Sequence, residues 1–514
     1  FKPILRAKAI AFENAAGRDR EVLDELGNTV LYGHPDAQAI LTKIQVENDR
    51  LLILRNTVEG ERPAGFVSYR EIGNEDLFGV LKDMELANLV RGKSSREILL
   101  ITGIYAREDG TGDSGVIRDA PQQLLVEVLA KELEKNYSFA LFVAERGTAT
   151  KEVVYVLERQ GFIRPHMADE NDKRTIYMVD MHEPLMFLHN LDTTIKEPFA
   201  SNPAVLDAVE KNHKKLQITM TKLYPGNLVL SLSSGIMYHR LVDRITALND
   251  VPREPLVPRR LGKNMCVPFG KILRGKVVPN TVTKTLHTDK VYEPDLNSFT
   301  IEPFPYYSPL KSQIETIKSF DRPVILVDDL VHTANRLQVL VPQLREDGIP
   351  IKKVVVGVLS GYGRDLMQCL KVPVESIYSM PNLRQWFVES TLYPFIGGDT
   401  VRREEMKVAG LQPSINMILP YATPRLSGCS REALVEFSAC CIENSRDLFQ
   451  VLEAEYRKMY AKNLTLSRLS EAVILPLCPD KGSCMEYDEN LAASVYLEND
   501  LETLWRMKEF MIKG

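Results

Sequence analysis

Two adjacent acids, Asp328 and Asp329, lie in the stretch of the sequence best suited to do chemistry. They end an apolar, β-branched run, and a short polar turn follows them before a predicted helix with apolar residues at helical spacing. Carboxylates at the end of a buried strand could stabilise positive charge that develops on a bound substrate. The alternative is structural, because the dipole of a helix favours two acids at its N-terminus.

The elements around these acids predict a parallel α/β sheet. The strand that holds the acids, the helix after them and the apolar run Val354–Leu359 form a βαβ unit. Upstream, Asn227–Leu232 is predicted as a buried strand, the turn Ser233-Ser234-Gly235 follows it, and 236–248 is predicted as the next helix. Ligands favour the turns at the carboxyl ends of such strands, so both turns are candidate binding loops.

The pattern Val327-Asp328-Asp329-x-x-x-Thr333 resembles the 5-phosphoribosyl 1-diphosphate motif of type I phosphoribosyltransferases, and the resemblance covers about residues 203–380. In that family the paired acids touch the ribose hydroxyls, directly or through Mg²⁺, and the loop after them holds the 5-phosphate. The resemblance therefore implies that Asp328 and Asp329 are catalytic and that Mg²⁺ is a cofactor. It also implies phosphate contacts by Thr333, Ala334, Asn335 and Arg336, a diphosphate loop at Ser233, Ser234 and Gly235, and a mobile flap that carries Arg274, Lys276 and Lys284.

Two positions depart from that family's pattern. The family usually has glycine where Ala334 stands and a hydroxyl residue near Arg336. We therefore expect a stiffer loop, or a phosphate held by a guanidinium. His332, in the same turn, is predicted as a hydrogen-bonding loop residue rather than as a general base. These departures leave open a second function, a non-catalytic sensor that binds a nucleotide or a phosphosugar.

The first part of the chain shows a different order of elements. Alternating runs at 51–55 and 64–70 predict an antiparallel hairpin, and a strand at 97–106 follows. Next come Arg107-x-x-Gly110-x-Gly112, a helix predicted at 120–135, a strand at 139–144, a helix at 150–160 and a strand at 174–181. Small residues after a strand allow the backbone to approach a phosphate closely, so this loop is a candidate anion site.

This order, with the glycine-containing loop after the central strand, resembles the GNAT-type N-acetyltransferase fold. The resemblance implies that Arg107, Gly110 and Gly112 meet the pyrophosphate of acetyl-CoA. The alternative is a surface turn with solvated acids, because Glu108 and Asp109 would repel a diphosphate. A protein in which acetyl transfer is the only chemistry therefore stays open as a third function.

Length and composition set the domain organisation. The chain has 514 residues, 26% charged and 44% hydrophobic, which predicts several globular domains rather than disorder or a fibrous repeat. We expect an α/β protein with a GNAT-like mixed-sheet domain over 1–185, a phosphoribosyltransferase-type parallel-sheet domain over 186–400 and a helical C-terminal region over 401–514. Ser430 is predicted to cap a long helix of this region, and Ser201-Asn202-Pro203 to start another helix upstream. The helical region could form a homodimer interface. A net charge of −5 does not favour nucleic acid as a partner.

Cysteine usage and hydropathy indicate the compartment. Seven scattered cysteines do not form a secreted disulfide framework, and no apolar run approaches the length of a membrane helix, so we expect a cytoplasmic protein without membrane contact. Cys478 and Cys484 lack the spacing of a structural zinc site, and no metal-binding residues are predicted. The chain begins at Phe1, which leaves room for an upstream domain.

The leading hypothesis from the sequence is a Mg²⁺-dependent transferase. It would move a phosphoribosyl group from phosphoribosyl diphosphate to an acceptor that the sequence does not identify. A domain that binds acyl-CoA would precede the transferase domain, and all expected partners are small molecules.

Overall fold

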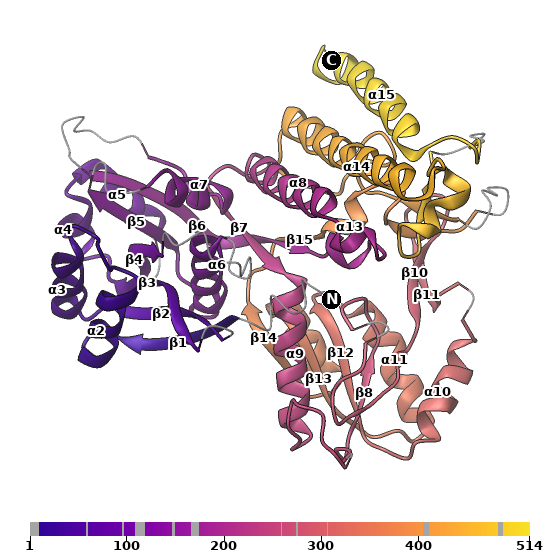
Figure 1. The fold of residues 1–514 in the computed structure, drawn as a ribbon, viewed down its shortest axis with the longest axis horizontal. Coiled ribbons are helices and arrows are strands. Elements are labelled where there is room, and N and C mark those ends of the chain that lie inside the picture. The colour runs from indigo at the N-terminus through magenta and orange to yellow at the C-terminus, as the bar shows by residue number, and fades with distance from the viewer. Residues whose placement is uncertain are drawn as a thin grey trace. The chain divides into compact units, whose positions relative to one another are not determined.

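The chain folds into two compact units of mixed α/β structure. The computed structural model describes residues 10–57, 60–94, 97–107, 119–145, 150–165, 174–258, 260–273, 276–305, 307–403, 411–481 and 487–513. Unit 1 contains residues 1–186, 224–231 and 379–385, and unit 2 contains 187–223, 232–378 and 386–514. Each unit is therefore built from separate stretches of the chain (Figure 1).

Unit 1 is organised around a mixed sheet in the order β1-β2-β3-β4-β5-β6, with β7 also pairing with β6. Neighbouring strands are antiparallel from β1 to β4 and between β5 and β6, whereas β4 and β5 are parallel. Its strands are β1 (Ile10–Ala16), β2 (Arg50–Asn56), β3 (Arg62–Ile72), β4 (Ile98–Ala106), β5 (Phe139–Glu145), β6 (Arg174–His189) and β7 (Asn227–Ser233). The predicted hairpin is confirmed as β2 and β3.

Six helices of the described residues accompany this sheet: α2 (Arg20–Thr29), α3 (Ala37–Glu47), α4 (Leu77–Leu81), α5 (Met84–Lys93), α6 (Ala120–Glu132) and α7 (Lys151–Arg159). The helix after β4 packs against β3 and β4 through a fully buried face that includes Leu124 and Leu129. Thr150 caps the helix that follows β5 by accepting a hydrogen bond from the N–H of Val153. Both helices were expected from their apolar spacing, and both are confirmed.

Gly161, just after α7, shows why β7 joins this sheet. Its φ is +89°, and an added Cβ would lie 2.1 Å from the carbonyl oxygen of Asn227, so only glycine fits there. The neighbouring Gln160 carbonyl accepts a hydrogen bond from the N–H of Val229 at 3.0 Å. The predicted strand over 227–232 therefore exists, but it belongs to the mixed sheet and not to the parallel sheet that holds Asp328.

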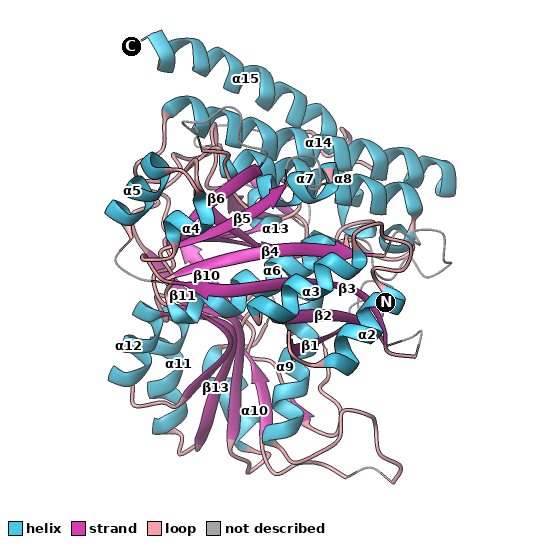
Figure 2. Cartoon of the chain, turned by 90° about the vertical axis from the view of Figure 1, so that its left-hand side faces the viewer, coloured by secondary structure: helices cyan, strands magenta, loops and turns pink. Residues whose placement is uncertain are grey.

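Unit 2 contains a parallel sheet in the order β14-β13-β12-β8-β9. Its strands are β8 (Met265–Pro268), β9 (Val282–Thr283), β12 (Val324–Val331), β13 (Ile351–Ser360) and, at the edge, β14 (Val374–Met380), and the pairs β9–β8, β8–β12 and β12–β13 are parallel. Val324 and Leu326 share a buried core with Val354 and Val356. In both views the strands run between α9 (Ser234–Leu248) and α11 (Asn335–Glu346), as Figure 1 and Figure 2 show.

The remaining elements of unit 2 are a second sheet and a group of helices. The second sheet has the order β11-β10-β16-β17-β18, with β10 (Thr288–Tyr292), β11 (Phe299–Pro303), β16 (Asp399–Val401), β17 (Gln412–Ile415) and β18 (Leu477–Pro479). Shorter elements are α10 (Leu310–Lys318), α12 (Gly361–Cys369), β15 (Gln385–Val388) and α13 (Glu389–Leu392).

Three long helices pack together in unit 2: α8 (Pro203–Thr221), α14 (Arg431–Tyr460) and α15 (Ala493–Lys513). Ser430 caps α14 by accepting a hydrogen bond from the N–H of Ala433 at 3.1 Å, as its position in the sequence predicted. Asn202 caps α8, and Pro203 occupies the first turn. Among the described residues, no helix is both long and apolar enough to cross a membrane.

Candidate functional site

Asp328 lies inside β12 and packs against the loop after β8. The acids were expected to end this strand, but its pairing with β13 continues two residues beyond Asp329, as far as Val331. An added Cβ at Gly270 would lie 1.5 Å from Oδ1 of Asp328, which means that the carboxyl group occupies the space a side chain would need. Oδ1 accepts a hydrogen bond from the N–H of Asp329 at 2.8 Å, and Asp328 is only 4% exposed. A glycine at 270 therefore makes this position of Asp328 possible.

The electrostatics of this pair differ from those of two free carboxylates. Burial raises the pKa of Asp328 well above its usual value, and the neighbouring charge of Asp329 adds to the shift. Arg336 opposes it only in part, since its Nη1 lies 3.8 Å from Oδ2 of Asp328. This environment disfavours two adjacent charged carboxylates, whereas the phosphoribosyltransferase resemblance implies two acids that contact the ribose hydroxyls or Mg²⁺.

Asp328 and Gly270 lie at the place where doubly wound sheets bind ligands. In chain order the parallel strands are β8, β9, β12, β13 and β14, and their spatial order is 2-1-3-4-5. The direction of winding changes between the first and third of these, which are β8 and β12, and the loops at their carboxyl ends diverge there. The position of the acids at this switch point supports a ligand site, whichever protonation state Asp328 holds.

The predicted phosphate loop forms the N-terminus of α11. Ala334 takes the N-cap position with a φ of +50° and makes no side-chain capping hydrogen bond. Asn335 donates from Nδ2 to Oγ1 of Thr333 at 2.8 Å. Within the described part of the chain, the buried Nε of Arg336 has no hydrogen-bond partner, and its side chain is 24% exposed. An uncapped helix N-terminus beside a guanidinium with a spare donor is suited to bind an anion.

His332 supports the neighbouring loop. Its Nδ1 lies 2.8 Å from Oγ of Ser360, which in turn accepts the N–H of Gly363 and caps α12. Burial lowers the pKa of His332. Its ring contacts those of Tyr362 and Trp386, so its contacts are those of a packed, hydrogen-bonding loop residue.

The residues predicted to bind diphosphate lie on several elements, and α9, which follows the serine turn, approaches the strand that holds the acids: an added Cβ at Gly357 would lie 2.1 Å from Sδ of Met237 and 2.7 Å from the carbonyl oxygen of Asp329. Ser233 ends β7 and caps α9, so Ser233, Ser234 and Gly235 follow a strand of the other sheet. The loop that does lie beside β12 is the one after β8, at Gly270. Lys284 is exposed just after β9, and Arg274 lies outside the described residues.

Lys276 has an environment of its own. Its Nζ lies 4.3 Å from the ring centre of Tyr238 on α9. Burial lowers the pKa of Lys276, and the charge of Asp192 partly opposes this. The acid that interacts electrostatically with Lys276 is therefore Asp192 and not Asp328.

In unit 1, the parallel strands β4 and β5 separate along their length. They pair only where Leu99–Ile101 faces Ala140–Phe142. Beyond that point β4 stays paired with β3 as far as Ala106, and β5 stays paired with β6 as far as Glu145. The two strands are thus held by their outer neighbours while their facing edges have no mutual pairing among the described residues. We call this opening the β4–β5 wedge.

The predicted coenzyme residues lie just beyond the wedge. The backbone N–H of Arg107 donates to the carbonyl of Ala64 at 3.0 Å, so this group continues the sheet and is not offered to a ligand. Gly110 and Gly112 lie outside the described residues. At the start of α6, Asp119 forms an ion pair with the buried Arg159, which offsets its negative charge.

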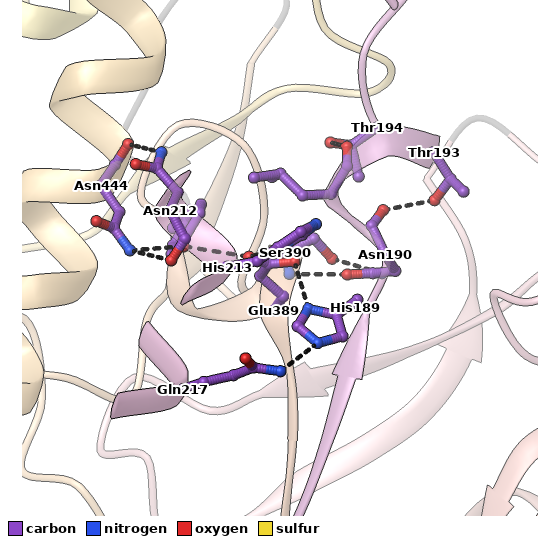
Figure 3. Close-up of polar contacts among 12 residues, drawn as sticks. His189, Asn190, Thr193, Thr194, Asn212, His213, Gln217, Glu389, Ser390 and Asn444 are labelled. Atoms are coloured by element: carbon purple, nitrogen blue, oxygen red, sulfur yellow. Dashed lines mark hydrogen bonds and ion pairs between the residues drawn. The ribbon is translucent and has the colours of Figure 1, made fainter. Parts of the chain in front are cut away.

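A buried cluster of two histidines and a glutamate, which the sequence did not reveal, lies in unit 2 (Figure 3). His189 ends β6, His213 lies on α8 and Glu389 begins α13. Nδ1 of His213 lies 2.6 Å from Oε1 of Glu389, and Nδ1 of His189 lies 3.8 Å from Oε2. We call these three residues the His–His–Glu cluster.

The charges of this cluster are strongly coupled. Burial opposes ionisation of the fully buried Glu389, but the two histidines outweigh it and lower the pKa of Glu389 to about 2. Burial also opposes protonation of His213, yet Glu389 outweighs it and the pKa of His213 is raised. A cation is therefore favoured next to the carboxylate.

A further set of hydrogen bonds holds the cluster. Tyr393 donates to Oε1 of Glu389 at 3.2 Å, and Nδ2 of Asn444 on α14 donates to the Tyr393 hydroxyl at 3.0 Å. Asn190 accepts the N–H of Ser390 and donates to its hydroxyl, both at 2.9 Å, which fixes the turn that begins α13. The sequence separations between these residues explain why no local motif predicted the site.

Comparisons with known proteins concern only part of the chain. No family model matches it, and no curated protein matches it. Solved structures that are similar include the NatC complex bound to Gag peptide and CoA (11% identity, 33% of this chain and 98% of that chain, TM-score 0.22). They also include a GNAT-family acetyltransferase of Bacillus cereus (14%, 33% and 96%, TM-score 0.21) and the catalytic domain of Tetrahymena GCN5 histone acetyltransferase with coenzyme A (10%, 34% and 94%, TM-score 0.23). At these identities and TM-scores the similarity does not indicate an activity. Any activity has to be inferred from the geometry of each unit.

Proposed function

We propose that unit 1 binds an acyl-CoA and transfers its acyl group. The observation that carries this proposal is the β4–β5 wedge. There each of the two parallel strands stays paired with its outer neighbour, but the two strands no longer pair with each other. Free backbone N–H and C=O groups on facing strand edges can pair with an extended ligand that carries amides. The pantetheine arm of coenzyme A is such a ligand, and its thioester would lie between the strands.

The element after the wedge supports the same proposal. The chain leaves β4 and next enters α6, whose N-terminus carries partial positive charge suited to a pyrophosphate. The pairing of Asp119 with Arg159 removes one source of repulsion from this end of the helix. The role of Arg107, Gly110 and Gly112 in holding the pyrophosphate remains part of the proposal.

Binding and turnover test the proposal separately. We expect acetyl-CoA to raise the melting temperature of the purified protein, and 3′,5′-ADP, which lacks the pantetheine arm, to do so less. Arg107→Ala should weaken binding about tenfold if its side chain meets a phosphate, and the exposed Arg18→Ala serves as the matched control. Release of free CoA in the presence of an amine panel would report transfer. No thermal shift with acetyl-CoA would count against the whole proposal.

We also propose that unit 2 binds the phosphate group of a phosphosugar or nucleotide at the N-terminus of α11. The observation that favours it is the buried Nε of Arg336, which has no partner among the described residues and lies beside an uncapped helix end. Phosphate would satisfy this donor and the free N–H groups together. Ala334 and Arg336 depart from the phosphoribosyltransferase pattern, and this favours binding without phosphoribosyl transfer, which corresponds to a sensor.

Calorimetry with phosphoribosyl diphosphate and with ribose 5-phosphate tests this second proposal. Arg336→Ala should weaken binding of both ligands by about tenfold or more, whereas the exposed Lys352→Ala should not. Diphosphate release with a panel of bases and amines would show that the site is catalytic after all. If Arg336→Ala and Lys352→Ala bind the two ligands equally well, Arg336 is not part of a phosphate site and the proposal is wrong.

A further inference from the structure

We propose that His189, His213 and Glu389 bind one divalent transition-metal ion. All three belong to unit 2, and they meet although they come from β6, α8 and α13. One possible ligand atom from each lies within 4.8 Å of the others. This site is independent of the two functions proposed above.

The spacing of the three donors is close to that of a metal site. Donors bound tetrahedrally at about 2.0–2.1 Å lie about 3.4 Å from one another. Here the distance from Nδ1 of His213 to Oε1 of Glu389 is 2.6 Å, and the distance from Nδ1 of His189 to Oε2 is 3.8 Å. The first distance is shorter than the tetrahedral value and the second, measured to the other carboxylate oxygen, is longer, so side-chain rotations would bring the three donors around one ion.

The donor types select the class of metal. Two imidazoles and one carboxylate favour Zn²⁺ and its first-row neighbours, whereas Mg²⁺ and Ca²⁺ prefer oxygen donors alone. Glu389 has no exposed surface, and a buried carboxylate needs a cation beside it. A divalent cation balances the buried negative charge of Glu389 better than one proton does.

Gln217 sets the orientation of one imidazole. It lies four residues after His213 on the same face of α8, and its Nε2 is 3.1 Å from Nε2 of His189. With the side-chain amide rotated by half a turn, Oε1 of Gln217 would accept a hydrogen bond from Nε2–H of His189, and Nδ1 of His189 would then be unprotonated and able to bind the metal. Gln217 is thus a positioning residue for the imidazole of His189. Figure 3 shows this contact together with the other contacts of the cluster.

The site is rigid on its carboxylate side and partly open on its imidazole side. Tyr393 and Asn444 hold Glu389 through the hydrogen bonds described above. The side chains of His189 and His213 are 15% and 21% exposed, so an ion can reach them. Three protein donors leave at least one position for water or a ligand, as in metal sites that do chemistry.

Cobalt provides the direct test, with the full-length protein stripped of metal by a chelator and dialysed. We expect Co²⁺ to bind in a one-to-one ratio with the visible absorption of a four- or five-coordinate site, and Zn²⁺ to displace it. His189→Ala and Glu389→Gln should abolish this spectrum. Gln217→Leu should weaken Co²⁺ binding about 10- to 100-fold. His287→Ala, in the same unit but stacked on Tyr307, is the matched control and should bind as the wild type does.

A second variant addresses the case in which a ligand substitution unfolds unit 2. His213→Cys should keep Co²⁺ bound and add a sulfur-to-cobalt charge-transfer band, which arises only if residue 213 touches the metal. Two results would overturn the proposal: wild-type protein that binds no Co²⁺ or Zn²⁺, and a His213→Cys variant that binds Co²⁺ without that band. In either case the cluster would be an ion pair that holds a proton in place of a metal.

Discussion

Gly270→Ala probes the contact on which the whole switch-point geometry depends. The added Cβ would lie 1.5 Å from Oδ1 of Asp328, whereas ordinary contacts of this kind begin near 3.4 Å. Asp328 would have to rotate away and give up the hydrogen bond from the N–H of Asp329. Overpacking costs about 1–3 kcal/mol and the lost hydrogen bond about 1 kcal/mol, so we expect unit 2 to lose about 2–4 kcal/mol.

The same substitution should cost far less when Asp328 is shortened. In an Asp328→Ala background the three atoms that the new Cβ would meet are gone, and we expect Gly270→Ala to cost less than about 1 kcal/mol. The favourable coupling between the two substitutions should therefore exceed about 1 kcal/mol. A favourable coupling energy is unusual, because one core substitution seldom reduces the loss of stability that another one causes.

Urea unfolding followed by tryptophan fluorescence measures this coupling. Both tryptophans, Trp386 and Trp505, belong to unit 2, so their signal reports that unit alone. Gly92→Ala in unit 1 is the control, because an added Cβ there meets nothing within 4 Å. If Gly270→Ala costs the same in both backgrounds, within about 0.5 kcal/mol, Asp328 does not occupy the space beside Gly270 and the reasoning is refuted.

Three further predictions concern unit 2. Ala334→Gly should raise its stability by about 1 kcal/mol because alanine is strained at a φ of +50°, while Ala454→Gly in the exposed middle of α14 should lower it by about 1 kcal/mol; equal signs in urea unfolding would contradict this. The raised pKa of Asp328 contributes stability that is complete below about pH 4 and is lost as the pH rises through that raised value, so Asp328→Asn should gain on the wild type between about pH 4 and 8, and a constant difference would disprove it. Ser430→Ala should cost about 1 kcal/mol by removing the cap of α14, and an unchanged urea midpoint would show that the cap does not matter.

Local patterns predicted most of the regular elements. Alternation and helical spacing located β2, β3, β4 and the helices α6 and α14, because these signals depend on residues a few positions apart. Asn202 and Ser430 marked helix starts correctly, since a cap is a contact within one turn.

Partner strands and distant contacts could not be predicted in the same way. The run 227–232 has the composition of a buried strand, but its partner is β6, which Gly161 and Asn227 help to determine through a backbone contact across the fold. The helix-spaced apolar residues of α2 follow Asp19, a cap that could have signalled this helix.

The candidate sites show the same limit. A two-acid motif within one strand was visible in the sequence, yet the space that the Asp328 carboxyl group occupies exists only because residue 270, far away in the chain, is a glycine. His189, His213 and Glu389 carry no local signature, because each lies on a different element and only tertiary packing brings them together.

The division of unit 1 into three stretches has a consequence for how the protein is made. A ribosome releases the chain from its N-terminus, and domains usually fold as they emerge. Here residues 224–231 and 379–385 complete a unit that begins with residues 1–186. The mixed sheet of unit 1 therefore stays incomplete while most of unit 2 is synthesised. A gene cut after the codon for Met186 would encode a sheet that lacks β7.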